Sequence, residues 1–359
     1  MSRALRIAII ASARYPIREP FAGGLEAQTW SLAHGLRARG HQVTLFAGPG
    51  DVAMPGIAEI HPRWPEISSV ARDDVSMTAP EWVAEHHAYL QVMLEMADTG
   101  GARFDVVHNN SLHYLPVAMA RSVRVPMVTT LHTPPTPWLE SAIQLGPCPI
   151  TFVAVSEHTA RAWRPTVPAV EVILNGIDLE RWRPGPGGGG LIWFGRLVPE
   201  KGPHLAIQAA RRARLPLNLI GPVPNQAYFD EQVKPILGDG IRYLGHLAHR
   251  ELSTLVGRAA ASLVTPCWDE PYGLVAAESL ACATPVAGFA RGALPELVDP
   301  TSAMLGPAGD VDALADAAVG ASALSRTMAR KHAETHCSIE QMLDGYEALY
   351  CRLSQRSAA

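Results

Sequence analysis

The sequence of 359 residues lacks several features that would assign it to a common class of protein. No apolar stretch approaches the roughly eighteen uninterrupted residues that a membrane-spanning helix needs. An excess of positive charge is also missing: the net charge is −4, whereas a general nucleic-acid binder normally carries a basic surface. Nucleic acid is therefore not an expected partner. The apolar run near the amino end is short and favours a first strand over a signal peptide.

Cysteine is scarce, and its spacing shows no pairs. The five cysteines are odd in number, which favours reduced thiols and predicts a cytoplasmic protein. The fourteen histidines form neither an HExxH motif nor a Cys/His cluster, so no metal site is expected. The GxGxxG fingerprint of dinucleotide-binding enzymes and the GxSxG elbow of serine hydrolases are absent too. These absences disfavour a nicotinamide oxidoreductase and a triad hydrolase.

What is present predicts a globular α/β enzyme of two domains. The length exceeds what one ordinary core encloses, and 48% hydrophobic with 18% charged residues is typical of globular proteins. Short apolar runs alternate with amphipathic stretches, as in parallel sheets covered by helices. Strands are expected at Leu5–Ala11, Gln42–Ala47, Asp105–His108, Pro126–Leu131, Thr151–Val155, Val170–Leu174, Leu191–Gly195, Leu217–Ile220, Ile241–Leu244, Ala261–Thr265 and Thr284–Gly288.

A Gly/Pro-rich segment interrupts this alternation. Residues 181–190 end in four consecutive glycines and have the composition of a hinge. We therefore expect an N-terminal domain at 1–180, a hinge at 181–190, a C-terminal domain at 191–335, and a terminal helix at 336–359 that can return to the N-terminal domain. Both domains are expected to be Rossmann-like, doubly wound α/β domains facing across a cleft, a favoured place for ligands.

Two glutamates with seven residues between them are the most informative pair in the chain. Glu270 follows a strand-like run in a loop that ends at Gly273, and Glu278 lies about two turns into an apolar helical segment. Burying a carboxylate costs free energy unless a partner satisfies it, and a donor-rich ligand such as a sugar would satisfy both. The helix start between them would attract an anion; capping of that helix by Asp269 or Glu270 is the alternative.

The segment GRLVPEKG at 195–202 follows a predicted strand and precedes a predicted helix. Its Arg196 and Lys201 could converge on a phosphate, the first as a planar fork and the second as a point charge. The alternative is a surface loop in which either cation pairs with Glu200.

Other candidates lie in the first half. Gly23 and Gly24 precede the first predicted helix and would let a backbone approach a ligand closely, although a turn explains the pair equally well. His108 and His132 each stand at the end of a strand, on the edge where doubly wound sheets hold ligands. For a single histidine, a hydrogen-bonded structural role is the alternative.

In this order the motifs resemble those of the family-four retaining glycosyltransferases, the glycosyl transferases group 1. The resemblance rests on the glycine pair, the NGID turn at 175–178, GRLVPEKG, and the run from Glu270 through Pro285, and it extends over nearly the whole chain. It implies the GT-B fold. It also implies transfer of a hexose, with retention and without a metal or cofactor, from a nucleotide diphosphate sugar, preferably a UDP-sugar, to an acceptor hydroxyl.

The resemblance further implies roles for individual residues. Arg196 and Lys201 would hold the donor diphosphate, Glu270 the transferred sugar, and Glu278 the ribose. A catalytic set of Glu270, His132, Arg196 and Lys201 follows, with His132 beside the sugar. The other implied donor-binding residues contact the phosphates and sugar or border the nucleobase: Gly23, Gly24, Gly273, Leu274, Val275, Tyr243 and Leu244.

Three positions depart from the family pattern without removing an implied ligand. Tyr272 stands for phenylalanine, Ala283 for glycine, and Arg291 for a small residue, which adds a cation near the expected nucleotide pocket. Two other functions stay open: a nucleotide-sugar epimerase of the same fold, which needs no acceptor, and a non-catalytic nucleotide-sugar-binding subunit.

The fold implies that the acceptor binds chiefly to the N-terminal half. The aromatic candidates there either line a pocket or belong to the core: Phe21, Trp64, Trp82, His113 and Trp138. Arg14 and Arg18 are candidates for contact with an anionic acceptor or for a peripheral membrane contact. The resemblance implies a hydroxyl as the acceptor group, and the sequence specifies neither the molecule that bears it nor an oligomeric state.

Overall fold

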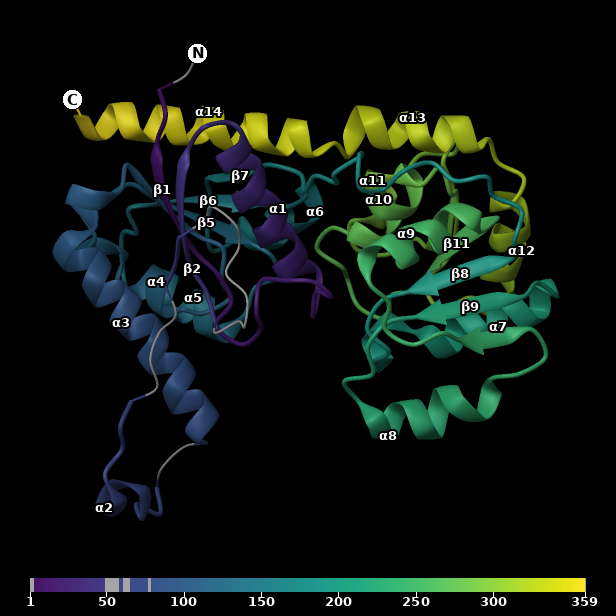
Figure 1. The fold of residues 1–359 in the computed structure, drawn as a ribbon, viewed down its shortest axis with the longest axis horizontal. Helices are drawn as coiled ribbons and strands as arrows, with labels where there is room; N and C mark the ends of the chain where they lie inside the picture. Colours follow the sequence, from purple (N-terminus) through teal and green to yellow (C-terminus); the bar gives the residue numbers. More distant parts are fainter. Residues whose placement is uncertain (1–2, 49–57, 61–64, 77–78, 359) are drawn as a thin grey trace. The chain divides into compact units, whose positions relative to one another are not determined.

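The computed structural model describes residues 3–48, 58–60, 65–76 and 79–358 (Figure 1). The chain divides into two compact units, each with its own parallel sheet. Unit 1 comprises Met1–Ala154, Ala160–Ile173 and Leu343–Ala359, and unit 2 comprises Val155–Thr159 and Leu174–Met342. This confirms the predicted α/β class with two doubly wound sheets. Among the described residues, no helix has both the length and the apolar character needed to cross a membrane.

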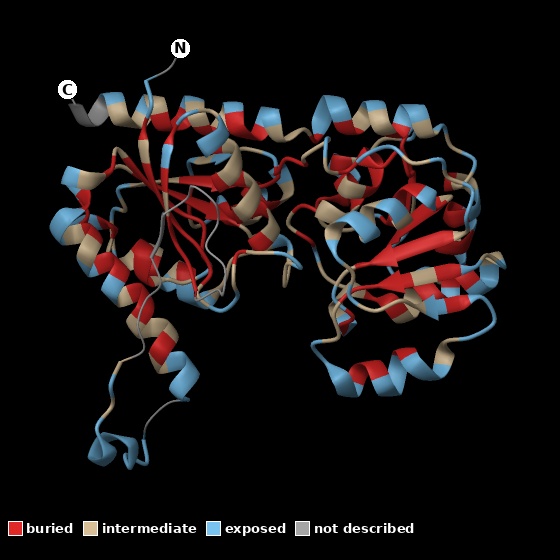
Figure 2. Ribbon diagram, in the orientation of Figure 1, coloured by how far each residue is buried: buried red, intermediate tan, exposed pale blue. Residues whose placement is uncertain are grey.

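Unit 1 is built on a seven-stranded sheet in the order β3-β2-β1-β4-β5-β6-β7, and every neighbouring pair is parallel. The central strands are buried, as Figure 2 shows, because helices cover both faces of such a sheet. The strands are β1 Arg6–Ile10, β2 Gln42–Phe46, β3 Ala58–Ile60, β4 Val106–Asn109, β5 Met127–Leu131, β6 Ile150–Ala154 and β7 Val170–Val172. The helices are α1 Gly24–Ala38, α2 Ser69–Arg72, α3 Pro80–Arg103, α4 Leu115–Ala118, α5 Pro137–Gln144, most of α6 Glu157–Trp163, and α14 Ile339–Ala358 from Leu343 onward.

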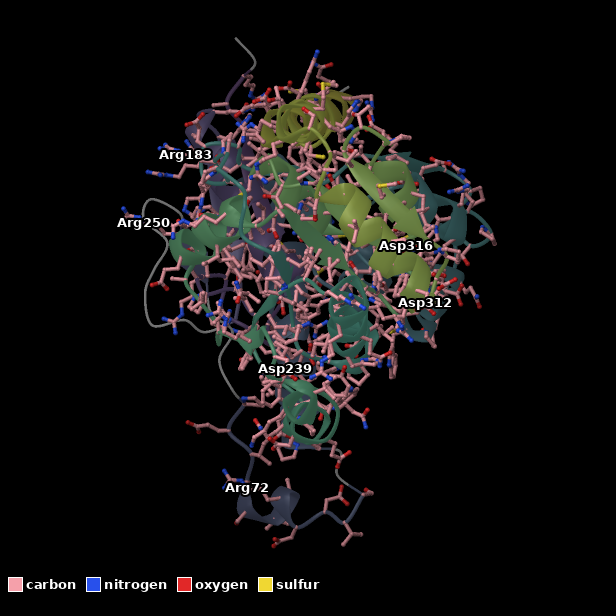
Figure 3. The ribbon with its side chains drawn as sticks, turned by 90° about the vertical axis from the view of Figure 1, so that its right-hand side faces the viewer. Arg72, Arg183, Asp239, Arg250, Asp312 and Asp316 are labelled. Carbon is pink, nitrogen blue, oxygen red and sulfur yellow. The ribbon has the colours of Figure 1, made fainter. Side chains whose placement is uncertain are left out.

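Unit 2 is built on a six-stranded parallel sheet in the order β10-β9-β8-β11-β12-β13. Charged residues such as Arg183, Arg250, Asp312 and Asp316 lie exposed on its surface (Figure 3). The strands are β8 Leu191–Phe194, β9 Leu217–Ile220, β10 Ile241–Tyr243, β11 Ala261–Val264, β12 Val286–Phe289 and β13 Ala303–Gly306. The helices are α7 Pro203–Ala213, α8 Gln226–Tyr228, α9 His249–Arg258, α10 Leu274–Ala281, α11 Leu294–Leu297, α12 Val311–Ala321 and α13 Arg326–His336.

The strand order reverses once in each sheet, between β1 and β4 in unit 1 and between β8 and β11 in unit 2. Connections from the two strands at such a point leave in opposite directions, so a crevice opens at their carboxyl ends. In unit 2 the two connections are GRLVPEKG and the loop that carries Glu270. In unit 1 they lead to the Gly23–Gly24 pair and to Asn110.

The Gly/Pro-rich segment is not a free linker between the units, which corrects the predicted boundaries. Residues 174–190 all belong to unit 2. Gly185 and Gly187 donate backbone hydrogen bonds to the carbonyls of Cys282 and Gly257, at 3.1 and 2.9 Å. A Cβ on Gly185 would lie 2.3 Å from the Gly257 carbonyl oxygen, so this glycine is required for close backbone packing rather than for flexibility.

The terminal helix α14 is held in unit 1 by a buried polar network. Tyr346 and Tyr350 are fully buried. The His108 ring lies 2.6 Å from the Tyr350 hydroxyl through Nδ1 and 2.7 Å from the Thr130 hydroxyl through Nε2. Burial lowers the pKa of His108 to about 3, so the ring is neutral. His108 therefore has the structural role that was the alternative for a strand-end histidine.

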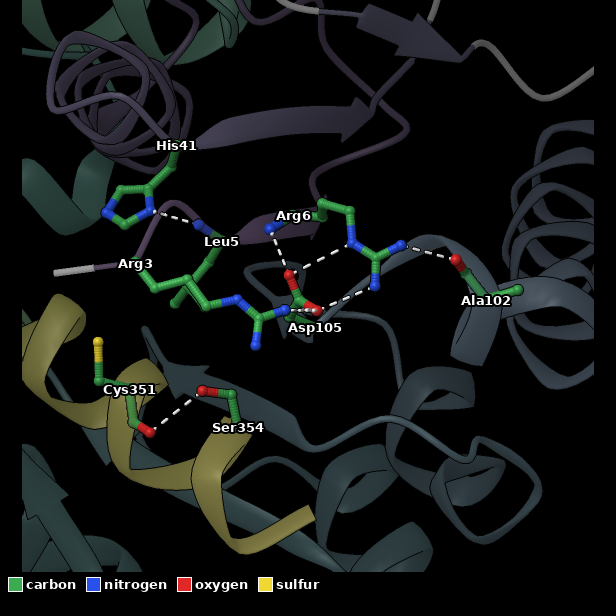
Figure 4. A network of polar contacts seen from close by, with 8 residues as sticks. All are labelled: Arg3, Leu5, Arg6, His41, Ala102, Asp105, Cys351 and Ser354. Atoms are coloured by element: carbon green, nitrogen blue, oxygen red, sulfur yellow. Dashed lines mark hydrogen bonds and ion pairs between the residues drawn. The ribbon is translucent and has the colours of Figure 1, made fainter. Parts of the chain in front are cut away.

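A second polar network fixes the amino end of β1 (Figure 4). The Arg6 backbone N–H donates to Asp105 Oδ2 at 2.8 Å, and its guanidinium donates to Oδ1 at 2.9 Å. Arg3 lies 3.6 Å from the same carboxylate, and the Leu5 N–H donates to His41 Nδ1 at 3.1 Å. The hydrogen bond from Arg6 lowers the pKa of Asp105 from its usual 3.8.

Replacing Asp105 by asparagine is expected to lower the free energy of unfolding of unit 1 by about 1–2 kcal/mol at pH 7, because a charge-assisted bond to Arg6 is lost. A lowered pKa stabilises the fold above the unfolded value of 3.8, and this contribution disappears as the pH falls through the folded pKa. Thermal melts of Asp105→Asn and wild type should therefore differ at pH 7 and converge below pH 3.8. Asp316→Asn, at an exposed site on α12, is the control; a difference that persisted in acid would contradict the assignment.

Candidate functional site

The crevice of unit 2 brings Lys201 and Glu270 together. Lys201 Nζ lies 2.5 Å from Glu270 Oε1, and the two side chains are 23% and 11% exposed. The ammonium group also lies 5.9 Å from the centroid of the Trp268 ring. An ammonium has three donors and a carboxylate about four acceptor positions. The pair therefore keeps both donors and acceptors for a ligand.

The position of Lys201 follows from the glycine beside it. Gly202 is left-handed, with φ +63°, and a Cβ there would lie 2.3 Å from the Thr265 carbonyl oxygen. The Thr265 hydroxyl, just after β11, lies 2.9 Å from the carbonyl oxygens of both Lys201 and Gly202 and accepts a hydrogen bond from Trp193 Nε1. This contact ties the turn after β8 to the end of β11, where the Glu270 loop begins.

Glu270 is positioned by the loop after β12. Gly292 has φ +61°, and a Cβ there would lie 2.4 Å from the Glu270 nitrogen. The Ala293 N–H donates to the Glu270 carbonyl at 2.9 Å. Arg291, one of the departures from the family pattern, donates from Nε to Asp269 Oδ1 at 2.9 Å. The Arg291 guanidinium therefore holds Asp269, the residue that precedes Glu270, in position.

Arg196 is not part of the Lys201–Glu270 pair. Its Nη2 lies 4.0 Å from Glu200 Oε1, and the two side chains are 43% and 45% exposed. The structure thus contains the Arg196–Glu200 pair of the surface-loop alternative but not a Lys201–Glu200 pair. An exposed pair at this distance contributes little, so the guanidinium can exchange Glu200 for a more strongly charged partner.

The start of α10 is open to an anion. Gly273 precedes the helix with φ +99°, and no side chain caps the helix in the described part of the chain. Asp269 and Glu270, which would cap this helix under the alternative interpretation, are bonded to Arg291 and Lys201 instead. The first N–H groups of an α-helix have no partner within the helix. The amides of Leu274 and Val275 therefore remain available, as an anion site requires.

Glu278 carries a carboxyl group without a protein partner. It forms no side-chain hydrogen bond or ion pair within the ranges that the structure describes. Burial raises the pKa of Glu278 from 4.5 to about 8, although part of the residue surface remains accessible. The carboxyl group is therefore mostly protonated at neutral pH without a ligand. A buried carboxyl group without a protein partner gains hydrogen bonds only when a ligand brings hydroxyl groups to it.

The predicted nucleobase border, Tyr243 and Leu244, lies at the end of β10. The Tyr243 hydroxyl donates to the Gly221 carbonyl at 2.7 Å, and its ring packs 5.0 Å from the Phe229 ring. Leu244 is partly buried against the core of unit 2. Both residues pack at the ends of β9 and β10, and the Tyr243 hydroxyl already donates a hydrogen bond within the protein.

Glycines follow three adjacent strands, and two of them, Gly221 and Gly245, were not predicted as site residues. Gly195, Gly221 and Gly245 follow β8, β9 and β10 with φ +147°, +147° and +84°. A Cβ on Gly221 would lie 1.8 Å from the Gly195 carbonyl oxygen, so the two loops touch through their backbones. The available signal was a glycine directly after each of three short apolar runs.

In unit 1, His132 at the end of β5 donates to Asn110. The His132 Nε2 lies 2.7 Å from Asn110 Oδ1, while the Asn110 amide nitrogen donates to Gln28 Oε1 at 2.7 Å and to Thr29 Oγ1 at 2.8 Å. Burial lowers the pKa of His132 to about 3. The ring is therefore neutral, with its proton on Nε2 and Nδ1 left as an acceptor. Asn110, which orients His132, was not predicted.

Gly23 and Gly24 form the start of α1. Gly23 is extended, with φ −167°, and caps the helix without a side chain. A Cβ there would lie 3.2 Å from Glu26 Oε2, so a side chain at this position would crowd the Glu26 carboxylate. Gln28 and Thr29, one turn further along α1, connect it to Asn110 and His132.

Two family models match the chain, one for each half. Residues 22–181 match Glycosyltransferase Family 4, and residues 188–329 match Glycosyl transferases group 1. Glycogen synthase of Mycobacterium tuberculosis is 30% identical over 320 residues, which cover 77% of this chain and 76% of that protein. D-inositol 3-phosphate glycosyltransferase of Frankia alni is 28% identical over 331 residues, 76% of this chain and 79% of that protein. The crystal structure of Anabaena HepE with UDP and glucose has a TM-score of 0.73 at 18% identity, over 96% of this chain and 99% of that one.

Proposed function

Because this chain belongs to glycosyltransferase family 4, has the GT-B fold and is a glycosyltransferase, we propose that it transfers a hexose from a UDP-sugar to an acceptor hydroxyl with retention at the anomeric carbon. One observation carries the proposal: the Lys201–Glu270 pair lies in the crevice of unit 2, whose next element, α10, starts without a cap. This arrangement offers a cation and open amides to a diphosphate and a carboxylate to a sugar.

The main catalytic effect in this proposal is electrostatic. As the bond between the anomeric carbon and the phosphate oxygen breaks, negative charge grows on the departing diphosphate. Lys201 and the amides of Leu274 and Val275 would stabilise that charge, with Arg196 released from Glu200 as a second cation. A single cation 4 Å from a phosphate charge contributes about 4 kcal/mol at an effective dielectric constant of 20. The proposal needs no metal ion to supply positive charge.

Glu270, Glu278 and His132 would orient the donor in this proposal. Glu270 accepts hydrogen bonds from sugar hydroxyls, and Glu278 accepts them from the ribose. The neutral His132 ring accepts a hydrogen bond from a sugar hydroxyl at Nδ1. The acceptor oxygen bonds to the anomeric carbon on the face that the diphosphate leaves, and its proton passes to a phosphate oxygen of the leaving group. The donor configuration is thereby retained without a covalent sugar–enzyme intermediate.

The UDP preference is supported by the bound ligands of Anabaena HepE, a protein of the same fold. A thermal-shift panel of UDP, GDP, ADP and their glucose conjugates tests it, because a ligand that binds only the folded state stabilises it by about 2.7 kcal/mol at a hundredfold excess over Kd. UDP and UDP-glucose are expected to raise the melting temperature most. Stabilisation by another nucleotide alone would overturn the UDP assignment.

Turnover separates transfer from the two other functions. Incubation of UDP-glucose with a hydroxyl acceptor is expected to give UDP and an α-linked product, read from the anomeric proton coupling by NMR. Conversion of the sugar without an acceptor would indicate an epimerase. Nucleotide binding without turnover on any acceptor would indicate a non-catalytic subunit.

A further inference from the structure

A row of aromatic rings lies on unit 1 apart from the predicted donor residues. The ring of Trp82 stacks on His86 at 5.0 Å, and His86 lies 6.0 Å from Tyr114. Tyr114 stacks on His113 at 5.0 Å and on Trp138 at 5.2 Å. We call these five residues the aromatic row. Its members come from α3, from the loop after β4 and from the first turn of α5.

The two ends of the row are exposed. Trp82 is 41% and Trp138 57% exposed, so these two predicted acceptor residues are not core residues. Large apolar side chains grouped at a surface mark a site of interaction. Of the other aromatic candidates, Phe21 packs 6.0 Å from Trp30, and Trp64 lies outside the described residues.

The row adjoins the His132 network. Its His113 lies three residues after Asn110, which accepts the hydrogen bond from His132. Its Trp138 lies on the connection after β5, which also carries His132. The Thr133 carbonyl of this connection accepts a hydrogen bond from Trp163 Nε1 at 2.7 Å. These connections leave β4 and β5, which are neighbours in the sheet. The row therefore continues from the carboxyl edge at which His132 lies.

The row offers flat ring faces and a hydrogen-bonding edge. The Leu115 N–H donates to His113 Nδ1 at 3.2 Å, which leaves the proton on Nε2 as a free donor within the described chain. Burial lowers the pKa of His113 to about 4, so the ring is uncharged at neutral pH. His86 Nδ1 is buried and has no partner in the described residues. Arg14, whose charge acts on His113, is paired with Glu85 at 2.9 Å.

We propose that the aromatic row is the acceptor subsite and that the acceptor is a neutral oligosaccharide. Its pyranose rings stack their C–H faces on Trp138 and Trp82, and a ring hydroxyl accepts the Nε2 proton of His113. A phosphorylated acceptor would have to displace Glu85 from Arg14, the cation whose charge acts on His113, whereas a neutral acceptor leaves that ion pair in place. The inference rests on the proposed glycosyl transfer and adds the chemical class of its acceptor.

Calorimetric titration without nucleotide tests the proposal. The ligands are maltohexaose, cellohexaose and mannohexaose, with D-inositol 3-phosphate as the charged alternative. Wild type is expected to bind at least one hexasaccharide, and Trp138→Ala and Trp82→Ala to weaken that binding by about tenfold each, as the loss of one ring contact implies. Trp138→Phe should restore most of the affinity. Leu94→Ala, at a 55% exposed position elsewhere on α3, is the matched control.

Three outcomes would overturn the proposal: no hexasaccharide binds to wild type, the two alanine variants bind as wild type does, or only D-inositol 3-phosphate binds. The UDP-induced melting shift of each variant should equal that of wild type, which also shows that the variants fold. Loss of that shift in wild type would instead overturn the proposed donor, so the two failures are distinguishable.

Discussion

Replacing Lys201 by methionine is expected to lower kcat/KM for the sugar donor by about a thousandfold. The lost interaction is the attraction between the ammonium group and the charge on the departing diphosphate, about 4 kcal/mol at an effective dielectric constant of 20, and each ~1.4 kcal/mol is tenfold in rate. Methionine keeps most of the volume of the side chain. The measurement is the steady-state rate of UDP release as a function of donor concentration.

A matched control is available on the same unit. Lys234 is exposed and lies 3.3 Å from Asp230, so Lys234→Met removes a paired lysine far along the chain from the crevice loops. Its kcat/KM should equal that of wild type. If Lys201→Met retained more than about a tenth of the wild-type value, the cation would contribute under ~1.4 kcal/mol and the role assigned to it would be wrong.

Replacing Glu278 by glutamine is expected to stabilise the free protein and weaken nucleotide binding at the same time. The pKa of Glu278 is raised from 4.5 to about 8 by burial, so the folded state holds a proton that the unfolded state releases. Between these pH values stability falls as pH rises, and above pH 8 the full penalty is present. Because part of the residue is accessible, we expect this penalty to be about 1–3 kcal/mol.

Thermal melts at pH 5, pH 7 and pH 8.5 test both effects. Glu278→Gln should melt with wild type at pH 5 and above it at pH 8.5. At pH 8.5 the shift caused by UDP should correspond to an affinity about 10–100-fold weaker in the variant, because an amide accepts ribose hydroxyls less well than a carboxylate. Glu251→Gln, at an exposed site on α9, is the control. A variant that lost stability at pH 8.5, or that bound UDP as wild type does, would show that Glu278 has another role.

The strands were predictable because both faces of a parallel sheet are covered. Leu191–Gly195 was expected and β8 is Leu191–Phe194; Gln42–Ala47 was expected and β2 is Gln42–Phe46. The strand β13 was missed because its apolar run, Ala303–Leu305, is only three residues long between Ser302 and Gly306, and its Met304 is 41% exposed. Composition alone reveals covered strands better than half-covered ones.

The Gly/Pro-rich segment shows the limit of composition as a guide to domain boundaries. Glycine suits a flexible linker and also a close backbone contact. At Gly185 the second applies, since its neighbour is the backbone of Gly257, seventy-odd residues later in the chain. Nothing local in the sequence distinguishes the two, because the contact exists only once α9 is in place.

The site residues could be predicted one by one, but not their pairing. Lys201 and Glu270 were both expected to face the donor, yet their mutual contact depends on Gly202 lying against Thr265. From the sequence, Lys201 could pair equally well with Glu200 or with Glu270, since both are glutamates. In the structure it pairs with Glu270. Asn110 was missed as the partner of His132 because a buried amide has no sequence signature of its own.

A crystal structure of the protein with UDP tests most directly whether unit 2 grips a pyrophosphate. We expect a β-phosphate oxygen within about 3 Å of Lys201 Nζ and of the Leu274 or Val275 nitrogen, with ribose hydroxyls hydrogen-bonded to Glu278. A nucleotide bound elsewhere, with Lys201 still paired only to Glu270 and Glu278 still alone, would contradict it.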